Sequence, residues 1–245
     1  MTILGIWAHP DDEVFVSGGL MADAVKGGER VACLHMTRGE AGLSFRRPCP
    51  PEILARIREN ELETALARLG VEGPRFFGYP DGCLAEVDSE EATVRIHDAL
   101  IEIQPDVIVT FGPEGFTGHP DHQALSAWVT AALSIWNTPH ARLYHAAVFG
   151  EWLDSFVPAL NEFDFFWPRH PVVTDHADVT LHLDDELLAA KIEALRKHAS
   201  QMKPLFDSYG DGFMRALVAS EHFALVPEPR RQFFARRRGM NEFAA

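Results

Sequence analysis

The sequence has few cysteines, no long apolar run and a shortage of basic residues, and each of these features excludes a class of protein. Its three cysteines, Cys33, Cys49 and Cys83, have no C-x-x-C spacing, which argues against a disulfide framework. No stretch of about 18 uninterrupted apolar residues occurs, so we expect no membrane-spanning helix. The N-terminus lacks the basic segment of a secretory signal. We therefore expect a cytoplasmic protein.

The charge balance argues against nucleic acid as a partner. The chain has 22 basic and 36 acidic residues, a net charge of −14, and such a surface repels phosphate backbones and anionic membranes. Residues 230–245 reverse the balance with five arginines. We interpret this tail as a solvated segment, with an anion-binding or oligomer contact as the alternative. The composition, 47% hydrophobic and 24% charged, suits one globular domain over residues 1–245, and whether it forms a homo-oligomer is left open.

Apolar runs alternate with amphipathic segments through the first 150 residues. Strands are predicted at 3–7, 30–36, 75–77, 106–111 and 142–149, and helices at 12–26, 51–69, 89–103 and 120–136. This alternation predicts parallel strands joined by right-handed crossovers. We expect an α/β fold with a mostly parallel open sheet and helices on both faces. Later in the chain, Asp184 is expected to cap a helix that continues through Met202.

The first predicted strand is followed by a loop with one imidazole and three carboxylates, Ala8-His9-Pro10-Asp11-Asp12-Glu13. In open α/β sheets, ligands bind beyond the carboxyl ends of the strands, so this loop lies where a site is expected. Imidazole and carboxylate are ligands for divalent metals, and His9 and Asp12 are close enough in sequence to reach one ion. The alternative is an acidic cluster that interacts with a helix dipole.

A second cluster, Gly118-His119-Pro120-Asp121-His122, follows another buried strand. If the two strands are neighbours, the two loops face each other. Two histidines and one aspartate leave a position open for water, as in catalytic zinc sites. A lone His-x-x-His is usually an ordinary surface or core pair, but two clusters in equivalent places favour a metal site. Zinc (Zn²⁺) is the expected cofactor, and ferrous iron (Fe²⁺) suits the same ligand types.

The two clusters contain more groups than three ligand positions need. Hydrolysis by a metal-activated water also requires a base and a donor for the oxyanion or leaving group. Asp11 and His119 are the groups left for these roles. We interpret Glu13 as a helix-start charge or a partner of a ligand, and Asp121 as a capping residue that also orients His119.

Together the clusters resemble the paired signature of the LmbE-like family, also called PIG-L deacetylases. The resemblance covers about residues 2–205 and includes further segments at 37–42, 57–62 and 78–82 and the late residues Lys191, His198 and Gln201. It implies a Rossmann-like fold. It also implies zinc-dependent de-N-acetylation of N-acetylglucosamine-containing molecules, including glycolipid and low-molecular-weight thiol precursors.

Position by position, the resemblance implies that His9, Asp12 and His122 are the metal ligands and that Asp11 is the general base. It implies that His119 stabilises the oxyanion or protonates the leaving amine. If these assignments hold, the five side chains lie close together in the folded protein.

The resemblance also implies that Arg58 and Asp81 hydrogen-bond the sugar hydroxyls. The alternative for Arg58 is an ion pair with Glu61 on the same helix. The alternative for Asp81 is a role in the turn beside Gly82.

One position departs from the family pattern. Members that act in mycothiol biosynthesis have a tyrosine two residues before the first histidine of the second motif, where this chain has Thr117. A phenol is therefore absent there, which makes a bacillithiol-type or other sugar-amide substrate comparably plausible.

The expected function is a metal-dependent amidohydrolase in which metal-bound water attacks the acetamide of a small amino-sugar substrate. One alternative is a hydrolase of another amide, such as a thiol S-conjugate. The other is a non-catalytic Rossmann-like binding module with a structural metal.

Overall fold

The computed structural model describes residues 1–42, 49–136, 140–163, 165, 166, 174 and 176–227. The strands are β1 (Thr2–Trp7), β2 (Arg30–His35), β3 (Arg75–Phe76), β4 (Val107–Phe111), β5 (Arg142–Ala146), β6 (Val179–His182) and β7 (Ser220–Leu225). The α-helices are α1 (Asp12–Lys26), α2 (Pro51–Leu69), α3 (Ser89–Ile103), α4 (Pro120–Trp136), α5 (Gly150–Leu160), α6 (Asp185–Leu195) and α7 (Ala199–Leu217). Two short 3-10 helices span Leu84–Glu86 and Asn161–Phe163. The arginine-rich tail lies outside the described residues.

The seven strands form one sheet in the order β3-β2-β1-β4-β5-β7-β6. The first five run parallel, whereas β7 is antiparallel to both β5 and β6. The predicted mostly parallel open sheet is confirmed. Strands β7 and β6, which the less regular second half of the sequence did not indicate, extend one edge.

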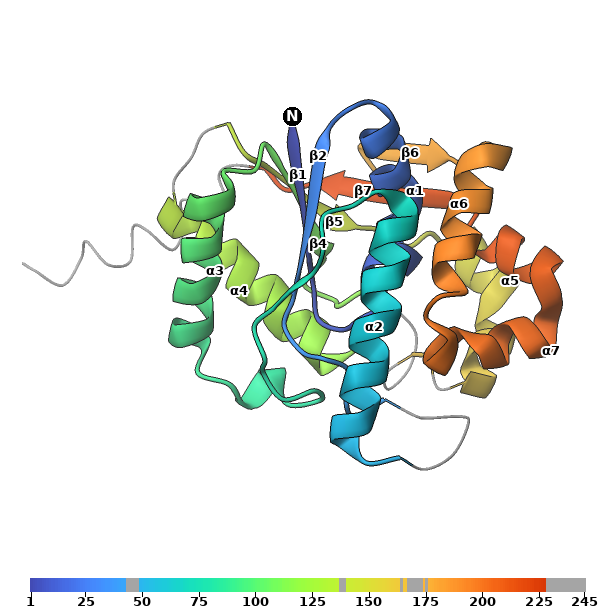
Figure 1. The fold of residues 1–245 in the computed structure, drawn as a ribbon. Helices are drawn as coiled ribbons and strands as arrows, with labels where there is room; N and C mark the ends of the chain where they lie inside the picture. Colours follow the sequence, from blue (N-terminus) through green and yellow to red (C-terminus); the bar gives the residue numbers. More distant parts are fainter. Residues whose placement is uncertain (43–48, 137–139, 164, 167–173, 175, 228–245) are drawn as a thin grey trace, which may run out of the picture.

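Helices cover both faces of the sheet, as expected. Helices α3 and α4 pack together on one side, and α1 packs with α2 and α6 on the other (Figure 1). The central parallel strands β1, β2 and β4 are almost wholly buried and mostly apolar, which is the pattern of strands covered on both faces. Among the described residues, no helix combines the length and apolar character needed to span a membrane.

The strand order reverses between β1 and β4. The chain moves outward from β1 through β2 to β3, then returns to place β4 on the other side of β1. The loops that leave the carboxyl ends of β1 and β4 therefore diverge, and the crevice between them is where ligands bind in such sheets. Both histidine-containing loops lie at this crevice.

The helix expected to continue from Asp184 through Met202 is instead two helices. Asp184 does cap the first one, because its side chain accepts the backbone N–H of Leu187 at 2.9 Å. Helix α6 then ends at Leu195, and α7 begins at Ala199. The break places His198 between the two helices, where it turns into the protein interior.

Candidate metal centre and active site

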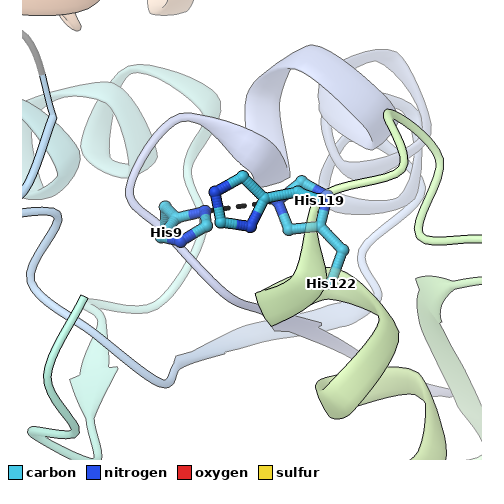
Figure 2. A group of neighbouring side chains, drawn as sticks. All are labelled: His9, His119 and His122. Carbon is cyan, nitrogen blue, oxygen red and sulfur yellow. Dashed lines mark hydrogen bonds between the residues drawn. The ribbon is translucent and has the colours of Figure 1, made fainter. Parts of the chain in front are cut away.

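Three imidazoles, from the loop after β1 and from the start of α4, lie close together (Figure 2). His9 follows β1, His119 lies just before α4, and His122 lies in its first turn. The ring centroid of His9 is 4.9 Å from that of His119 and 5.2 Å from that of His122. The structure therefore brings together the two clusters that the sequence places 110 residues apart.

The three expected ligands, His9, Asp12 and His122, lie around one point. His9 Nδ1 is 3.2 Å from His122 Nε2 and 3.5 Å from Asp12 Oδ2. His122 Nε2 is 3.4 Å from Asp12 Oδ1. Ligand bonds of about 2.1 Å at tetrahedral angles put neighbouring ligand atoms about 3.4 Å apart. The spacing therefore fits a small divalent ion with a fourth position outside this trio.

The second nitrogen of each ligand imidazole is already engaged. His122 Nδ1 is 2.9 Å from the carbonyl oxygen of Gly115. His9 Nε2 is 3.0 Å from Asp81 Oδ1 and 3.2 Å from Asp121 Oδ2. Such contacts fix the ring orientation and direct the remaining nitrogen toward a metal.

Two other groups of ligand-type atoms occur here, His9 with His119 and His122, and His9 with Asp81 and Asp121. In the second group, the carboxylates are used within the protein. Asp81 Oδ2 accepts the N–H of Ala41, and the two oxygens of Asp121 accept those of Leu84 and Gly82. We therefore assign these carboxylates to the support of His9.

The electrostatics of the trio favour a bound cation. Burial lowers the pKa of His9, but hydrogen bonds with Asp12, Asp121 and Asp81 outweigh it and raise this pKa well above its usual value. Burial lowers the pKa of His122 to about 4, so this ring is neutral, as a ligand must be. Burial raises the pKa of Asp12, but His122 and His9 outweigh it and bring this pKa to about 2.

Asp11 precedes α1 in an unusual backbone conformation, with a φ of 107°. Its carboxylate Oδ2 is 3.1 Å from Arg58 Nη2. Burial raises the pKa of Asp11, Arg58 opposes the increase and Asp12 adds to it, so that this pKa reaches about 6. A carboxyl with a pKa near neutrality is suited to accept and return a proton.

Arg58 is buried and holds the loop after β1. Its Nη2 donates to the carbonyl oxygen of Pro10 at 2.6 Å and its Nη1 to that of Gly39 at 2.8 Å. The alternative of an ion pair with Glu61 is wrong, because the Glu61 carboxylate binds the backbone N–H and the hydroxyl of Ser200. Contact between Arg58 and a sugar hydroxyl stays a prediction.

Asp81 lies in the loop after β3 and faces His9 directly. A reciprocal pair ties this loop to the loop after β2. Asp81 accepts the N–H of Ala41, and Glu40 accepts that of Asp81 at 3.0 Å. Asp81 therefore binds His9 and the N–H of Ala41 in addition to its place in the turn. Its contact with substrate stays a prediction.

Asp121 and His119 interact differently from the expectation. The Asp121 side chain, fully buried, contacts His9 and the Gly82 and Leu84 amides, whereas its backbone N–H donates to His119 Nδ1 at 3.1 Å. Burial and the nearby His9 lower the pKa of His119, which keeps its ring neutral. Asp121 therefore orients His119 through the backbone rather than through its carboxylate.

His35 is a buried histidine close to the candidate site that the sequence analysis did not identify. His35 at the end of β2 places Nε2 3.0 Å from Glu13 Oε2, and His198 places Nε2 2.9 Å from Glu13 Oε1. His35 is the single histidine in the apolar run 31–36. A lone imidazole in such a strand was the signal available for finding it.

Comparison with known proteins gives consistent relatives. A model of the family described as PIG-L, GlcNAc-PI de-N-acetylase, matches residues 4–133. A 1D-myo-inositol 2-acetamido-2-deoxy-alpha-D-glucopyranoside deacetylase of Corynebacterium diphtheriae is 31% identical over 81% of this chain and 75% of its own.

Solved structures share the fold. The N,N'-diacetylchitobiose deacetylase of Pyrococcus horikoshii aligns with a TM-score of 0.68 at 21% identity, over 95% of this chain and 85% of its own. A 4-carboxy-2-hydroxymuconate hydratase of Pseudomonas putida KT2440 aligns with a TM-score of 0.61 at 16% identity, over 92% and 96% of the two chains. Proteins with this fold therefore catalyse more than one reaction, and a function for this chain has to be argued from the residues of its site.

Proposed function

The chain belongs to the PIG-L (GlcNAc-PI de-N-acetylase) family, and from that premise we propose that it is a metal-dependent amidohydrolase that removes acetyl from an N-acetylglucosamine-containing small molecule. The observation that carries the proposal is the spacing of 3.2 to 3.5 Å among ligand atoms of His9, Asp12 and His122. Asp11 and His119 adjoin this trio.

Zinc is the proposed ion, with ferrous iron as the second choice, because two imidazoles and one carboxylate suit both. The donors fit such an ion in spacing. The neutral His122 and the ionised Asp12 also fit it in protonation state, whereas His9, whose pKa is raised by its carboxylate partners, would release a proton when the ion binds. A divalent ion held there would polarise the acetamide carbonyl and lower the pKa of a water molecule.

Asp11 is proposed as the base that takes a proton from the attacking water and passes it to the leaving amine. Arg58 contacts Asp11 Oδ2, so we assign the proton transfer to Oδ1. His119 Nδ1 accepts the N–H of Asp121, so the neutral ring carries its hydrogen on Nε2. That N–H is proposed to donate to the oxyanion that forms during attack.

We propose a wider range of aglycones for the substrate than the names of the relatives specify. Their names specify an inositol glycoside. Thr117, whose hydroxyl lies 3.4 Å from His122 Nδ1, supplies no phenol at the position where the mycothiol branch has tyrosine. We propose a small amino-sugar substrate of thiol-precursor or glycoconjugate type. With its cysteines free, we propose a reducing, cytoplasmic location.

The test is acetate release from a panel of N-acetylglucosaminyl compounds that differ in aglycone, with metal analysis before and after chelation. We expect chelation to abolish release and zinc or ferrous iron to restore it. A structural metal predicts no acetate release and no cleavage of a thiol S-conjugate tested beside the panel. Another amide specificity predicts cleavage of the thiol S-conjugate without acetate release from the panel.

Two variants separate metal binding from chemistry. Asp11→Ala is expected to retain metal and to lose about 10²- to 10⁴-fold in kcat, the range typical of a general base. His122→Ala is expected to lose the metal itself. Full activity of Asp11→Ala would contradict the assignment of the base.

A further inference from the structure

Asp11 occupies a conformation that a residue with a side chain avoids. Its φ of 107° lies in the region that favours glycine, because the Cβ collides there with neighbouring backbone atoms. Such residues persist only where the surroundings hold them, and they concentrate at functional sites. The question is which contacts hold Asp11.

Two charged side chains hold the peptide group that precedes the Asp11 Cα. Arg58 binds the carbonyl oxygen of Pro10 and the carboxylate of Asp11. Glu13 reaches back along the chain, and its Oε2 accepts the backbone N–H of Asp11 at 2.9 Å. The peptide group between Pro10 and Asp11 is therefore held at its carbonyl by a cation and at its N–H by an anion, and Arg58 also holds the Asp11 side chain.

Glu13 is itself held by two imidazoles from distant parts of the chain. His35 comes from β2, and His198 comes from the break between α6 and α7, 185 residues away. The three side chains are at most 1% exposed. Ser200, two residues beyond His198, ties the same segment to Glu61 of α2.

A buried glutamate with two imidazoles is a costly way to fill a core, since apolar side chains of similar volume do so without desolvating charge. Apart from the two imidazoles, the hydrogen-bond partner of the Glu13 carboxylate among the described residues is the N–H of Asp11, which belongs to the candidate site. His198 also lies beyond residues 4–133, the segment matched by the family model.

We propose that Glu13 and His198 are positioning residues that act through Asp11. His198 fixes the Glu13 carboxylate, the carboxylate fixes the Asp11 N–H, and Asp11 thereby keeps its side chain aimed at the metal centre. The proposal deepens the proposed deacetylase function and rests on it for its kinetic test.

The experiment compares zinc-loaded His198→Leu with the wild type. Leucine fills the space and removes the N–H that Glu13 accepts. We expect kcat per bound metal to fall by about 10- to 100-fold, as when supporting hydrogen bonds of metal sites are removed. We expect KM and metal content to change little, because the ligands are untouched. His198→Gln, whose amide N–H also donates to Glu13, is expected to recover most of the loss.

A second measurement does not depend on activity. Hydrogen exchange of the Asp11 amide, followed by NMR, is expected to accelerate about tenfold or more in His198→Leu and to stay slow in His198→Gln. Ser200→Ala is the matched control, because it loosens the same segment without touching Glu13. We expect its kcat and Asp11 exchange to equal those of the wild type. If His198→Leu does not fold, His198→Asn, too short to reach Glu13, replaces it.

Three results would overturn the proposal. The first is an unchanged kcat and an unchanged Asp11 exchange rate in His198→Leu. The second is a loss of metal in proportion to the loss of activity, which would assign His198 to metal binding. The third is an equal effect of Ser200→Ala, which would reduce His198 to a packing role. A wild type that releases no acetate would refute the proposed function, and amide exchange would still decide the role of His198.

Discussion

Two buried glutamates with similar hydrogen-bonding partners lie along α1, Glu13 within the helix and Glu221 on the neighbouring strand β7. Glu221 on β7 accepts the N–H groups of Gly19 and Leu20, which are exposed by a break of the helix at Ser17, and is paired with Lys191 at 2.6 Å. Glu13 accepts the N–H of Asp11 at the start of the helix and is paired with two imidazoles. Each is a buried carboxylate with a basic partner and a backbone donor.

The difference lies in what each carboxylate holds. Glu221 satisfies N–H groups that an interrupted helix leaves without partners, which the fold needs wherever a helix breaks in the interior. Glu13 holds a residue whose backbone is strained and whose carboxylate is the proposed general base. The same construction therefore supports the fold in one place and the chemistry in the other. Variants that affect only stability or only turnover test this division.

The largest expected change in stability comes from Lys191→Met. Removing one partner leaves Glu221 charged and buried, and breaking such a pair costs about 3–5 kcal/mol. Urea unfolding measures this loss, and kcat per bound metal of the folded fraction is expected to match the wild type. Lys191→Met combined with Glu221→Gln is the control, because it removes the charge and keeps an acceptor for one N–H, so it should recover part of the stability. A fall in kcat of the folded protein would erase the distinction between the two glutamates.

Asp11→Gly is expected to change stability by a smaller amount and in the opposite direction. Glycine adopts a φ of 107° without strain, and a residue held in a sparsely populated region costs about 1–3 kcal/mol. Burial also raises the pKa of Asp11, so its carboxylate is ionised at neutral pH against a desolvation cost. We expect a stability gain of about 1–3 kcal/mol in urea with chelator present, together with the loss of turnover. A destabilised Asp11→Gly would mean that the contact with Arg58 outweighs the strain.

The sequence predicts the parallel half of the fold well because the relevant signals are local. Buried strands and amphipathic helices alternate, and the capping residue Asp184 marks its helix. The motif histidines come together because β1 and β4 are neighbours. Adjacent loops at one edge of a parallel sheet are a consequence of strand order, which the alternating pattern left open and the structure supplies.

What the sequence does not predict depends on contacts between distant residues. The break before α7 follows from no proline or glycine between 195 and 199, and it is needed to bring His198 to Glu13. The sequence likewise does not predict the partner of Arg58, because Glu61 lies one helical turn away and is an equally good candidate. Only the assembled structure shows that Glu61 serves Ser200 and that Arg58 serves Asp11.

The smallest expected effect on stability separates two glycines with the same φ of 73°, Gly39 and Gly70. Alanine in the left-handed region costs about 1–2 kcal/mol at either position. At Gly70, which ends α2, the added Cβ would lie 2.8 Å from Val25, and we expect a loss of stability alone. At Gly39 the Cβ would overlap the Arg58 guanidinium. Gly39→Ala is therefore expected to displace Arg58 from Asp11 and to lower kcat per bound metal, whereas Gly70→Ala leaves it unchanged. Equal kcat values for the two variants would show that the Arg58 contact is dispensable, and the positioning of Asp11 would then depend on Glu13 alone.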